Sequence, residues 1–408
     1  MTDDTVYDEF DVPRVINAVG DHTRVGGTLI RPAALDAMAE AGAEFVSLYD
    51  LQARASERIA DATGAEAGLV TNGAASGLVL ATAAAIAGTD YRALDSLPHV
   101  EDRPTEVLVP RAQRNEYDAA FRAAGADVVG VGHVDLKTGT AALKPWELDA
   151  AIDEETAAVA YIATPRTRLS LATVCEVAHD HDVPVIVDAA AELPPTRNLA
   201  RFVEAGADAV AFSGGKAIRG PQTTGILAGT RDIIEPAALL SIPSDTHEAL
   251  WDPPDELIRR DEVPGMPNHG IGRPLKVGKE ELVGLLRALE LFREEDDDAL
   301  YAECNERARR LRDELAETPG LDVTLTHADE PDAVSELYLD LDPDEDEDEA
   351  AIGPETLIRD LRNEDPRVYV GERLLDEGLV VVNPKRLTDE QADYVAERIA
   401  ARVSVESY

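Results

Sequence analysis

Lys216 lies directly after a segment with the pattern of a buried strand. The strand predicted at Ala207–Phe212 runs into Ser213 and two glycines, and Lys216 follows. The chain contains only 6 lysines, so solvation of the surface does not account for this one. A partly buried amine in this place can form a Schiff base with a carbonyl compound, because burial lowers the pKa of lysine. The alternative is a lysine whose side chain extends from the turn into solvent.

A carboxylate follows the preceding predicted strand. Residues 183–187 (VPVIV) lead into Asp188, which is followed by AAAELPP. In a parallel sheet this places Asp188 at the same edge as Lys216. A carboxylate one strand away from a reactive lysine is what pyridoxal 5'-phosphate (PLP) requires, because it pairs with the protonated ring nitrogen and keeps the ring electron-withdrawing. The alternative role of Asp188 is a helix N-cap.

A third segment could bind the phosphate of this cofactor. Residues 66–77 (EAGLVTNGAASG) read as an apolar strand, a turn and a helix start made of small residues. Small side chains leave the first N–H groups of a helix accessible, at the positive end of its dipole. The candidates are Gly73, Ala74, Ala75 and Ser76. Tight packing is the alternative explanation for such a turn.

The elements that carry these residues alternate between strands and helices. From about Leu35 to Gly229, short apolar runs alternate with amphipathic stretches, which predicts βα units and a mostly parallel sheet. Strands are expected at 157–163, 183–187 and 207–212, and helices at 171–181 and 198–205. Helices at 280–292 and 299–317 then lead to an α+β region. In that region we expect strands at 321–326, 335–341, 367–370 and 379–382, and helices at 354–362 and 388–401.

Five segments resemble PLP enzymes of the selenocysteine synthase (L-seryl-tRNA selenium transferase) family, and especially its shorter members similar to D-glucosaminate-6-phosphate ammonia lyase. They are VINAVGDHTRVGGT at 15–28, TGAEAGLVTNGAASGLVLATAAAIAG at 63–88, VPVIVDAAAELPP at 183–195, FSGGKAIRGPQTTGIL at 212–227 and GRPLKVGKEELVGLL at 272–286.

The resemblance implies the PLP-dependent transferase fold of type I, which is aspartate-aminotransferase-like. It implies an N-terminal segment at 1–30 that contributes to the active site, a large PLP-binding α/β domain at 31–290 and a small α+β domain at 291–408. It also implies an internal aldimine at Lys216, a ring-nitrogen partner at Asp188, further cofactor contacts from Ser213 and Gln113, and an active site completed by a second subunit.

The chain departs from the family pattern at two places. Gln113 stands where relatives often carry a histidine that stacks on the cofactor ring, and an amide plane stacks more weakly. Asp21 and His22 replace small, Thr-like residues in a segment expected to line the substrate pocket; His22 could be a local acid or base, or a turn residue. The family motif also begins at Ile16, without the additional N-terminal domain that binds tRNA in the bacterial selenium transferases, which argues against the tRNA reaction.

Basic residues provide candidate anchors for an anionic substrate. Arginine binds carboxylate or phosphate through two parallel hydrogen bonds. We expect Asn17, Arg24 and Arg273 to bind substrate, with Arg219 as a further candidate anchor. Lys276 and Lys279 could contact cofactor phosphate or substrate, or pack at a helix start.

Composition excludes several classes of function. The formal charge is −43, with 81 acidic against 38 basic residues along the whole chain, which predicts a halophilic surface and a poor nucleic-acid binder. Cys175 and Cys304 stand alone, so neither a disulfide framework nor a metal site is expected. The N-terminus lacks the pattern of a signal peptide and no apolar stretch is long enough to span a membrane, so we expect a soluble, cytoplasmic protein.

The sequence therefore predicts a homo-oligomeric PLP enzyme that acts on a small, anionic amino compound. Cα deprotonation followed by elimination, as in an ammonia lyase, is preferred by resemblance. A selenium or sulfur transferase acting on a seryl group, or an aminotransferase, is the alternative, and a PLP-binding regulator without turnover is a third reading.

Overall fold

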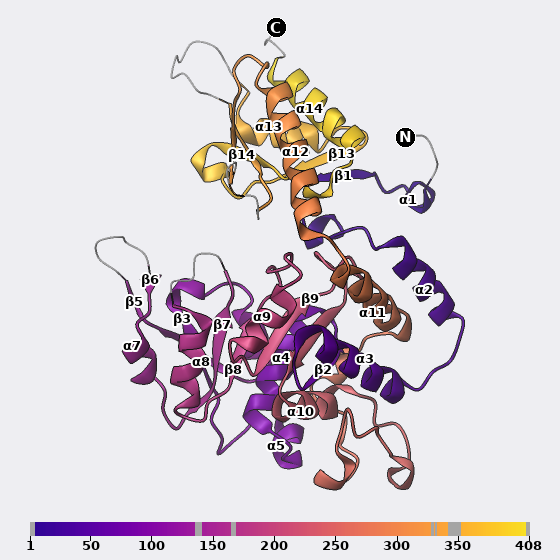
Figure 1. The fold of residues 1–408 in the computed structure, drawn as a ribbon, viewed down its shortest axis with the longest axis vertical. Helices are drawn as coiled ribbons and strands as arrows, with labels where there is room; N and C mark the ends of the chain where they lie inside the picture. The colour runs from indigo at the N-terminus through magenta and orange to yellow at the C-terminus, as the bar shows by residue number, and fades with distance from the viewer. Residues whose placement is uncertain are drawn as a thin grey trace. The chain divides into compact units, whose positions relative to one another are not determined.

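The computed structural model describes residues 5–134, 141–164, 169–327, 330, 333–341 and 352–404. The chain divides into two compact units (Figure 1). One consists of Leu29–Glu294, and the other combines Met1–Thr28 with Glu295–Tyr408.

The unit Leu29–Glu294 is built on a seven-stranded sheet with the order β2-β10-β9-β8-β7-β3-β4. Its neighbouring strands are parallel except that β10 runs antiparallel to both β2 and β9. The mostly parallel α/β fold is therefore confirmed. The strands are β2 (Ala67–Thr71), β3 (Glu106–Pro110), β4 (Asp127–Val131), β7 (Thr156–Ile162), β8 (Val185–Asp188), β9 (Ala209–Ser213) and β10 (Gly225–Gly229).

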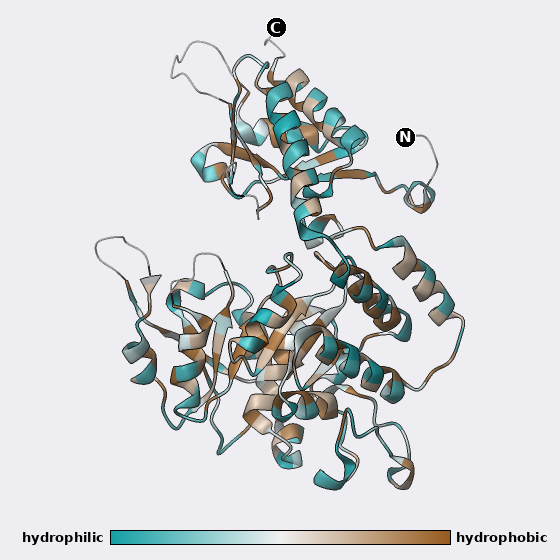
Figure 2. Cartoon of the chain, viewed as in Figure 1, coloured by the Kyte–Doolittle hydropathy of each residue, from teal (hydrophilic) through white to brown (hydrophobic). Residues whose placement is uncertain are grey.

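Helix α4 (Gly73–Ala87) is buried along almost its whole length and packs against β9, β10 and helix α10 (Arg231–Ser241). Its alanines and glycines allow this close approach to the sheet. The other described α-helices of the unit are α2 (Pro32–Gly42), α3 (Leu48–Thr63), α5 (Tyr91–Ser96), α6 (Asp118–Ala123), α7 (Pro145–Asp149), α8 (Leu171–His179), α9 (Asn198–Glu204) and α11 (Lys279–Arg293). Strands β5 (His133–Val134) and β6 (Ala141–Ala142) pair antiparallel. In Figure 2, hydrophilic colour is concentrated on outer helices such as α3.

The free edge of β2 is covered by side chains of α3. The Gln52 amide donates to the carbonyl of Val70 (3.0 Å) and accepts from its N–H (3.2 Å). One helical turn later, the Ser56 hydroxyl accepts from the N–H of Gly68 (3.0 Å). Because these groups pair the backbone of an edge strand, they prevent its pairing with another chain.

The other unit contains a three-stranded antiparallel sheet and one further strand pair. The sheet has the order β11 (Asp322–Leu325), β12 (Leu337–Asp340), β14 (Leu379–Val382). Near the N-terminus, β1 (Val15–Ala18) pairs in parallel with β13 (Arg367–Val370). The helices are α1 (Val6–Glu9), α12 (Asp297–Leu315), α13 (Pro354–Leu361) and α14 (Asp389–Val403). Among the described residues of both units, no helix combines the length and apolarity that crossing a bilayer requires.

Candidate active site

The strand register brings Asp188 and Ser213, two of the residues predicted from the sequence, to one edge of the sheet. Asp188, the last residue of β8, pairs with Ile162 on β7 and with Ala211 on β9. Two residues further along β9, Ser213 pairs with Gly225, which also pairs with Thr71 at the end of β2. The carboxyl ends of four strands therefore meet where an open α/β sheet binds its ligands.

Lys216 lies in a tight turn that follows β9 and requires glycine. The Gly214 N–H donates to the carbonyl of Thr224 (2.8 Å). A Cβ atom on Gly214 would lie 2.3 Å from the Thr224 hydroxyl oxygen, and one on Gly215 would lie 2.7 Å from the Cα of Gln222. These close approaches explain why two glycines precede Lys216, which is held partly buried beyond the end of the strand.

Asp188 is a buried carboxyl group whose ionisation depends on its neighbours. Burial raises its pKa, while a hydrogen bond from the Ala190 N–H (3.0 Å) and the nearby charge of Lys216 lower it, and the net shift is upward. A buried carboxylate is stabilised by a cationic partner. Asp188 therefore suits a protonated ring nitrogen, and the Lys216 charge is close enough to act on its pKa.

Glu192 is a second carboxyl group near this edge, and it was not among the residues predicted from the sequence. Burial raises its pKa; the charge of Arg201 lowers it and the charge of Asp188 raises it. Its backbone is fixed in a turn, because its N–H donates to the carbonyl of Ala189 (3.2 Å) and its carbonyl accepts from the Asn198 side chain (2.6 Å). The sequence feature that could have identified Glu192 is its position four residues after Asp188.

The N-terminus of α4 has the form of an anion-binding site. Gly73 adopts a positive φ of 76°, and a Cβ atom there would meet no atom within 4 Å. Among the described contacts, the Asn72 side chain does not cap this helix and instead donates to the carbonyl of Lys276 (3.3 Å). Because the first N–H groups of a helix have no partner within it, Gly73, Ala74, Ala75 and Ser76 fit the phosphate of PLP.

Gln113 follows β3 in a short 3-10 turn and is buried. Its Oε1 accepts a hydrogen bond from the N–H of Ile162 at the end of β7 (2.8 Å). Gln113 thus ties two strand ends together next to the strand that carries Asp188. Stacking of its amide on a cofactor ring stays a prediction.

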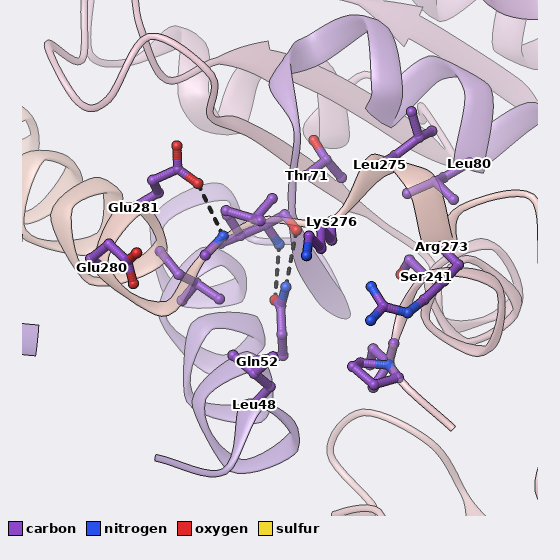
Figure 3. A pocket seen from close by; sticks show the side chains of 16 residues that line it. Leu48, Gln52, Thr71, Leu80, Ser241, Arg273, Leu275, Lys276, Glu280 and Glu281 are labelled. Carbon is purple, nitrogen blue, oxygen red and sulfur yellow. Dashed lines mark hydrogen bonds between the residues drawn. The ribbon is translucent and has the colours of Figure 1, made fainter. Parts of the chain in front are cut away.

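Arg273 and Lys276 line a pocket of about 430 Å³ at the end of β2 (Figure 3). No carboxylate among the described residues forms an ion pair with either cation. Lys216 and Asp188 are not among the lining residues. The residues that line the pocket are Leu48, Gln52, Val70, Thr71, Leu80, Ser241, Ile242, Pro243, Arg273, Leu275, Lys276, Val277, Gly278, Glu280, Glu281 and Leu282.

Asn17 and Arg24 belong to the other unit, where both have local partners. The Asn17 side chain donates to the carbonyl of Gly20 (2.9 Å) and accepts from the N–H of Val19 (3.0 Å). Arg24 forms an ion pair with Glu372. Asn17 therefore shapes the turn after β1, and substrate binding by either residue stays a prediction.

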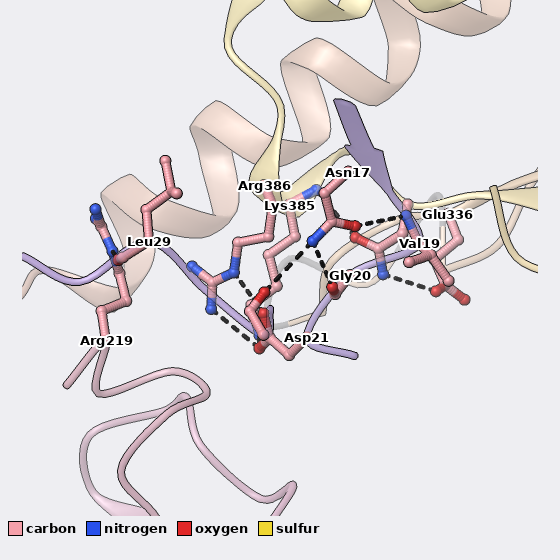
Figure 4. Close-up of polar contacts among 11 residues, drawn as sticks. Asn17, Val19, Gly20, Asp21, Leu29, Arg219, Glu336, Lys385 and Arg386 are labelled. Carbon is pink, nitrogen blue, oxygen red and sulfur yellow. Dashed lines mark hydrogen bonds and ion pairs between the residues drawn. The ribbon is translucent and has the colours of Figure 1, made fainter. Parts of the chain in front are cut away.

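Asp21, one of the two departures near the N-terminus, forms a largely buried ion cluster (Figure 4). Its Oδ2 accepts from the Lys385 ammonium (3.0 Å) and from the Arg386 guanidinium (3.0 Å). Its side chain is 13% exposed. Burial opposes its ionisation, but the two cations lower its pKa to about 2. The second departure, His22, accepts the Gly27 N–H through its carbonyl (2.9 Å), as a turn residue would.

The family model and the most similar relatives that were found agree on the family of this chain. Residues 115–340 match the model of class-V aminotransferases. A 5'-C-glycyluridine monooxygenase-decarboxylase from Streptomyces sp is 30% identical over 96% of this chain and 90% of that protein. The D-glucosaminate-6-phosphate ammonia lyase of Salmonella typhimurium is 27% identical over 97% of this chain and 96% of its own length.

Two further matches bear on the expected resemblance. An L-seryl-tRNA(Sec) selenium transferase from Geobacter metallireducens is 28% identical, but over only 56% of this chain and 51% of that protein. A solved structure of D-glucosaminate-6-phosphate ammonia-lyase superposes with a TM-score of 0.78 at 25% identity and covers 99% of this chain and 100% of that one. The predicted resemblance and the type I fold are both confirmed.

Proposed function

Because the chain belongs to the class-V aminotransferase family of PLP-dependent enzymes, we propose that it uses PLP to remove a Cα proton from a small anionic amino compound and to eliminate a β-substituent or ammonia. The observation that carries the proposal is the coupling of Asp188 to Lys216 at adjacent strand ends, beside the open N-terminus of α4.

Each group of this edge has a defined role in the proposal. Lys216 binds the cofactor covalently and its Nζ moves the substrate proton, Asp188 pairs with the ring nitrogen, and Gly73–Ser76 with Ser213 hold the phosphate. When bound, PLP supplies an electron sink for the developing carbanion. Arg273, which has no ion-pair partner among the described residues, binds the anionic group of the substrate.

The relatives differ in the reaction that their names describe, so the step that follows proton removal has to be determined by experiment. One of the full-length relatives is an ammonia lyase and another is a monooxygenase-decarboxylase, at similar identity. We favour elimination because the solved ammonia-lyase structure covers 99% of the chain. A seryl transferase is the second candidate, supported by relatives that match about half of the chain.

Replacing Lys216 tests the central assignment. Borohydride reduction of the PLP-loaded protein and mass spectrometry of its peptides should place the cofactor on the peptide that contains Lys216. Lys216→Ala should lose this label, whereas Lys144→Ala, which changes an exposed lysine on another element, should keep it. A label on a different lysine in the wild type would refute the assignment.

A second experiment separates the reaction classes. The protein is incubated in potassium chloride with amino-sugar phosphates, amino acids and seryl compounds, while ammonia, 2-oxo acid and oxygen consumption are followed. Ammonia release that is lost in Arg273→Ala supports elimination and the anchor. Saturable seryl-tRNA binding in a filter assay supports the transferase, and substrate-dependent oxygen consumption supports the monooxygenase reaction.

A further inference from the structure

Glu281, in the first turn of α11, accepts hydrogen bonds from two different parts of the chain. One carboxylate oxygen accepts from the Thr223 hydroxyl (2.7 Å). The other accepts from the N–H of Gly278, the residue before the helix (3.0 Å), as Figure 3 shows. The bond from Gly278 caps the helix. The bond from Thr223 has a different effect, because it ties α11 to the segment between Lys216 and β10.

The segment that carries Thr223 closes the turn of Lys216. The Gly214 N–H, before Lys216, donates to the carbonyl of Thr224 (2.8 Å), after it. The N–H and the hydroxyl of Thr224 both donate to the carbonyl of Pro221 (3.0 Å and 2.7 Å). Residues 214–224 therefore form a closed loop, and a fixed position of Thr223 restricts the position of Lys216.

Helix α11 packs closely against this loop. A Cβ atom on Gly220 would lie 3.2 Å from the Cδ1 of Leu285, which is fully buried. A Cβ atom on Gly284 would lie 3.1 Å from the Cγ of Pro221. Glycines on both elements thus allow the contact, and Glu281 adds a polar bond at the N-terminal end of the helix.

The residues that directly follow Lys216 are held by a different element. The Arg31 N–H donates to the carbonyl of Arg219 (3.0 Å), and the Arg31 guanidinium donates to the carbonyl of Ile218 (2.8 Å). These bonds fix the first half of the loop, and the bond from Thr223 to Glu281 fixes the second half.

Glu281 is also part of the pocket wall. The pocket in Figure 3 is lined by two cations, Arg273 and Lys276, and by the neighbouring carboxylates of Glu280 and Glu281. The Glu280 carboxylate lies 3.6 Å from the Lys279 ammonium, whereas that of Glu281 binds the loop of Lys216. Glu281 therefore connects the pocket of the proposed substrate anchor to the loop of the proposed cofactor lysine.

We infer that Glu281 is a positioning residue, which holds the Lys216 loop in a fixed place relative to the Arg273 pocket through its bond with Thr223. The inference rests on the proposed function for the role of Lys216. A hydroxyl group that donates to a carboxylate forms a stronger bond than one that donates to a neutral acceptor, so its loss should be measurable.

Hydrogen exchange of the cofactor-free chain in molar potassium chloride tests the link without PLP. In Thr223→Val, which removes the hydroxyl but keeps a branched side chain, the N–H groups of residues 214–224 should exchange roughly tenfold faster. Glu281→Gln should act in the same direction, because an amide has one oxygen and cannot accept from both donors. Thr223→Ser should restore the wild-type rate, and Glu280→Gln should leave it unchanged.

Exchange in β7 should stay at the wild-type rate in all these variants, which would show that the effect is local. An unchanged rate in the loop of Thr223→Val would overturn the inference. So would equal acceleration throughout the chain, or a Thr223→Ser protein that behaves like Thr223→Val.

The PLP-loaded protein supplies the second readout. Thr223→Val should bind PLP roughly fivefold more weakly and show a weaker near-visible circular dichroism band, because the lysine that holds the cofactor is less well fixed. Thr223→Ser should restore both. Faster exchange with unchanged PLP affinity and an unchanged band would refute the positioning of Lys216. A wild type that binds no PLP would overturn the proposed function, while the exchange rates would still decide on the link, so the two failures can be distinguished.

Discussion

The charge state of Asp188 is set by a small number of neighbours. Its burial raises the pKa, and among the described residues the Ala190 N–H and Lys216 act in the opposite direction. Glu192 adds a second negative charge when it is ionised. A bound cationic ring would therefore provide the stabilisation that the carboxylate lacks in the protein alone.

Asp188→Asn should lower turnover about a hundredfold, because an amide cannot keep the ring nitrogen protonated. This corresponds to about 3 kcal/mol of transition-state stabilisation. Ammonia release under saturating substrate provides the measurement. Asp180→Asn, at an exposed position after α8, is the control and should retain activity. Turnover at the wild-type level in Asp188→Asn would remove this residue from its role.

Among the elements, the contact between α4 and β10 positions the proposed phosphate site. A Cβ atom on Gly225 would lie 2.4 Å from the carbonyl carbon of Gly73. The helix start can therefore approach the sheet only because β10 begins with glycine. Gly42, near the end of α2, has no atom within 4 Å of its Cβ position and no positive φ.

Gly225→Ala should destabilise the protein by about 1–3 kcal/mol and weaken PLP binding, since the added methyl group displaces the start of α4. Gly42→Ala should leave both quantities nearly unchanged. Thermal melting and PLP titration of the two variants check this. Equal behaviour of the two alanine variants would contradict the close contact.

The element pattern could be predicted well where periodicity was strong. The strands expected at 157–163 and 367–370 appear at Thr156–Ile162 and Arg367–Val370, and the helix expected at 354–362 at Pro354–Leu361. β10 was not predicted, because its short Gly-Ile-Leu-Ala-Gly run resembles a turn, and its antiparallel direction depends on tertiary pairing. The pairing of β1 with β13 joins residues some 350 positions apart, which local patterns cannot reveal.

For the candidate site, the sequence allowed the positions of some strand-end residues to be predicted, and their roles stay predictions. Asp188 and Lys216 follow apolar runs, so their common edge was foreseeable. The ion pairs of Asp21 with Lys385 and Arg386 could not be predicted, because they join residues near the two ends of the chain.

For the molecule as a whole, the Asp21 cluster links stability to pH. Its pKa is about 2 in the folded protein, below the ordinary value of 3.8. The ionised cluster therefore contributes stability above about pH 4, and this contribution is lost as the pH falls towards 2. Its size is about 2.5 kcal/mol.

Asp21→Asn should lower the melting temperature at pH 6 and reduce the loss of stability between pH 4 and pH 2. The exposed Asp36→Asn serves as the control and should follow the wild-type profile. Identical acid profiles for Asp21→Asn and the wild type would show that the cluster does not contribute.

The net charge of the whole molecule predicts a requirement for salt. The 43 net negative charges are spread over 20705 Å² of accessible surface. The mean distance between net charges is then roughly 22 Å, whereas the screening length is about 30 Å at 0.01 M salt and about 3 Å at 1 M. Repulsion is therefore unscreened in dilute buffer and negligible in molar salt.

Melting followed by circular dichroism should show a large loss of stability on dialysis from molar to millimolar potassium chloride. Sucrose at equal osmolality should not restore stability, because it does not screen charge; a melting temperature independent of salt would refute the halophilic interpretation.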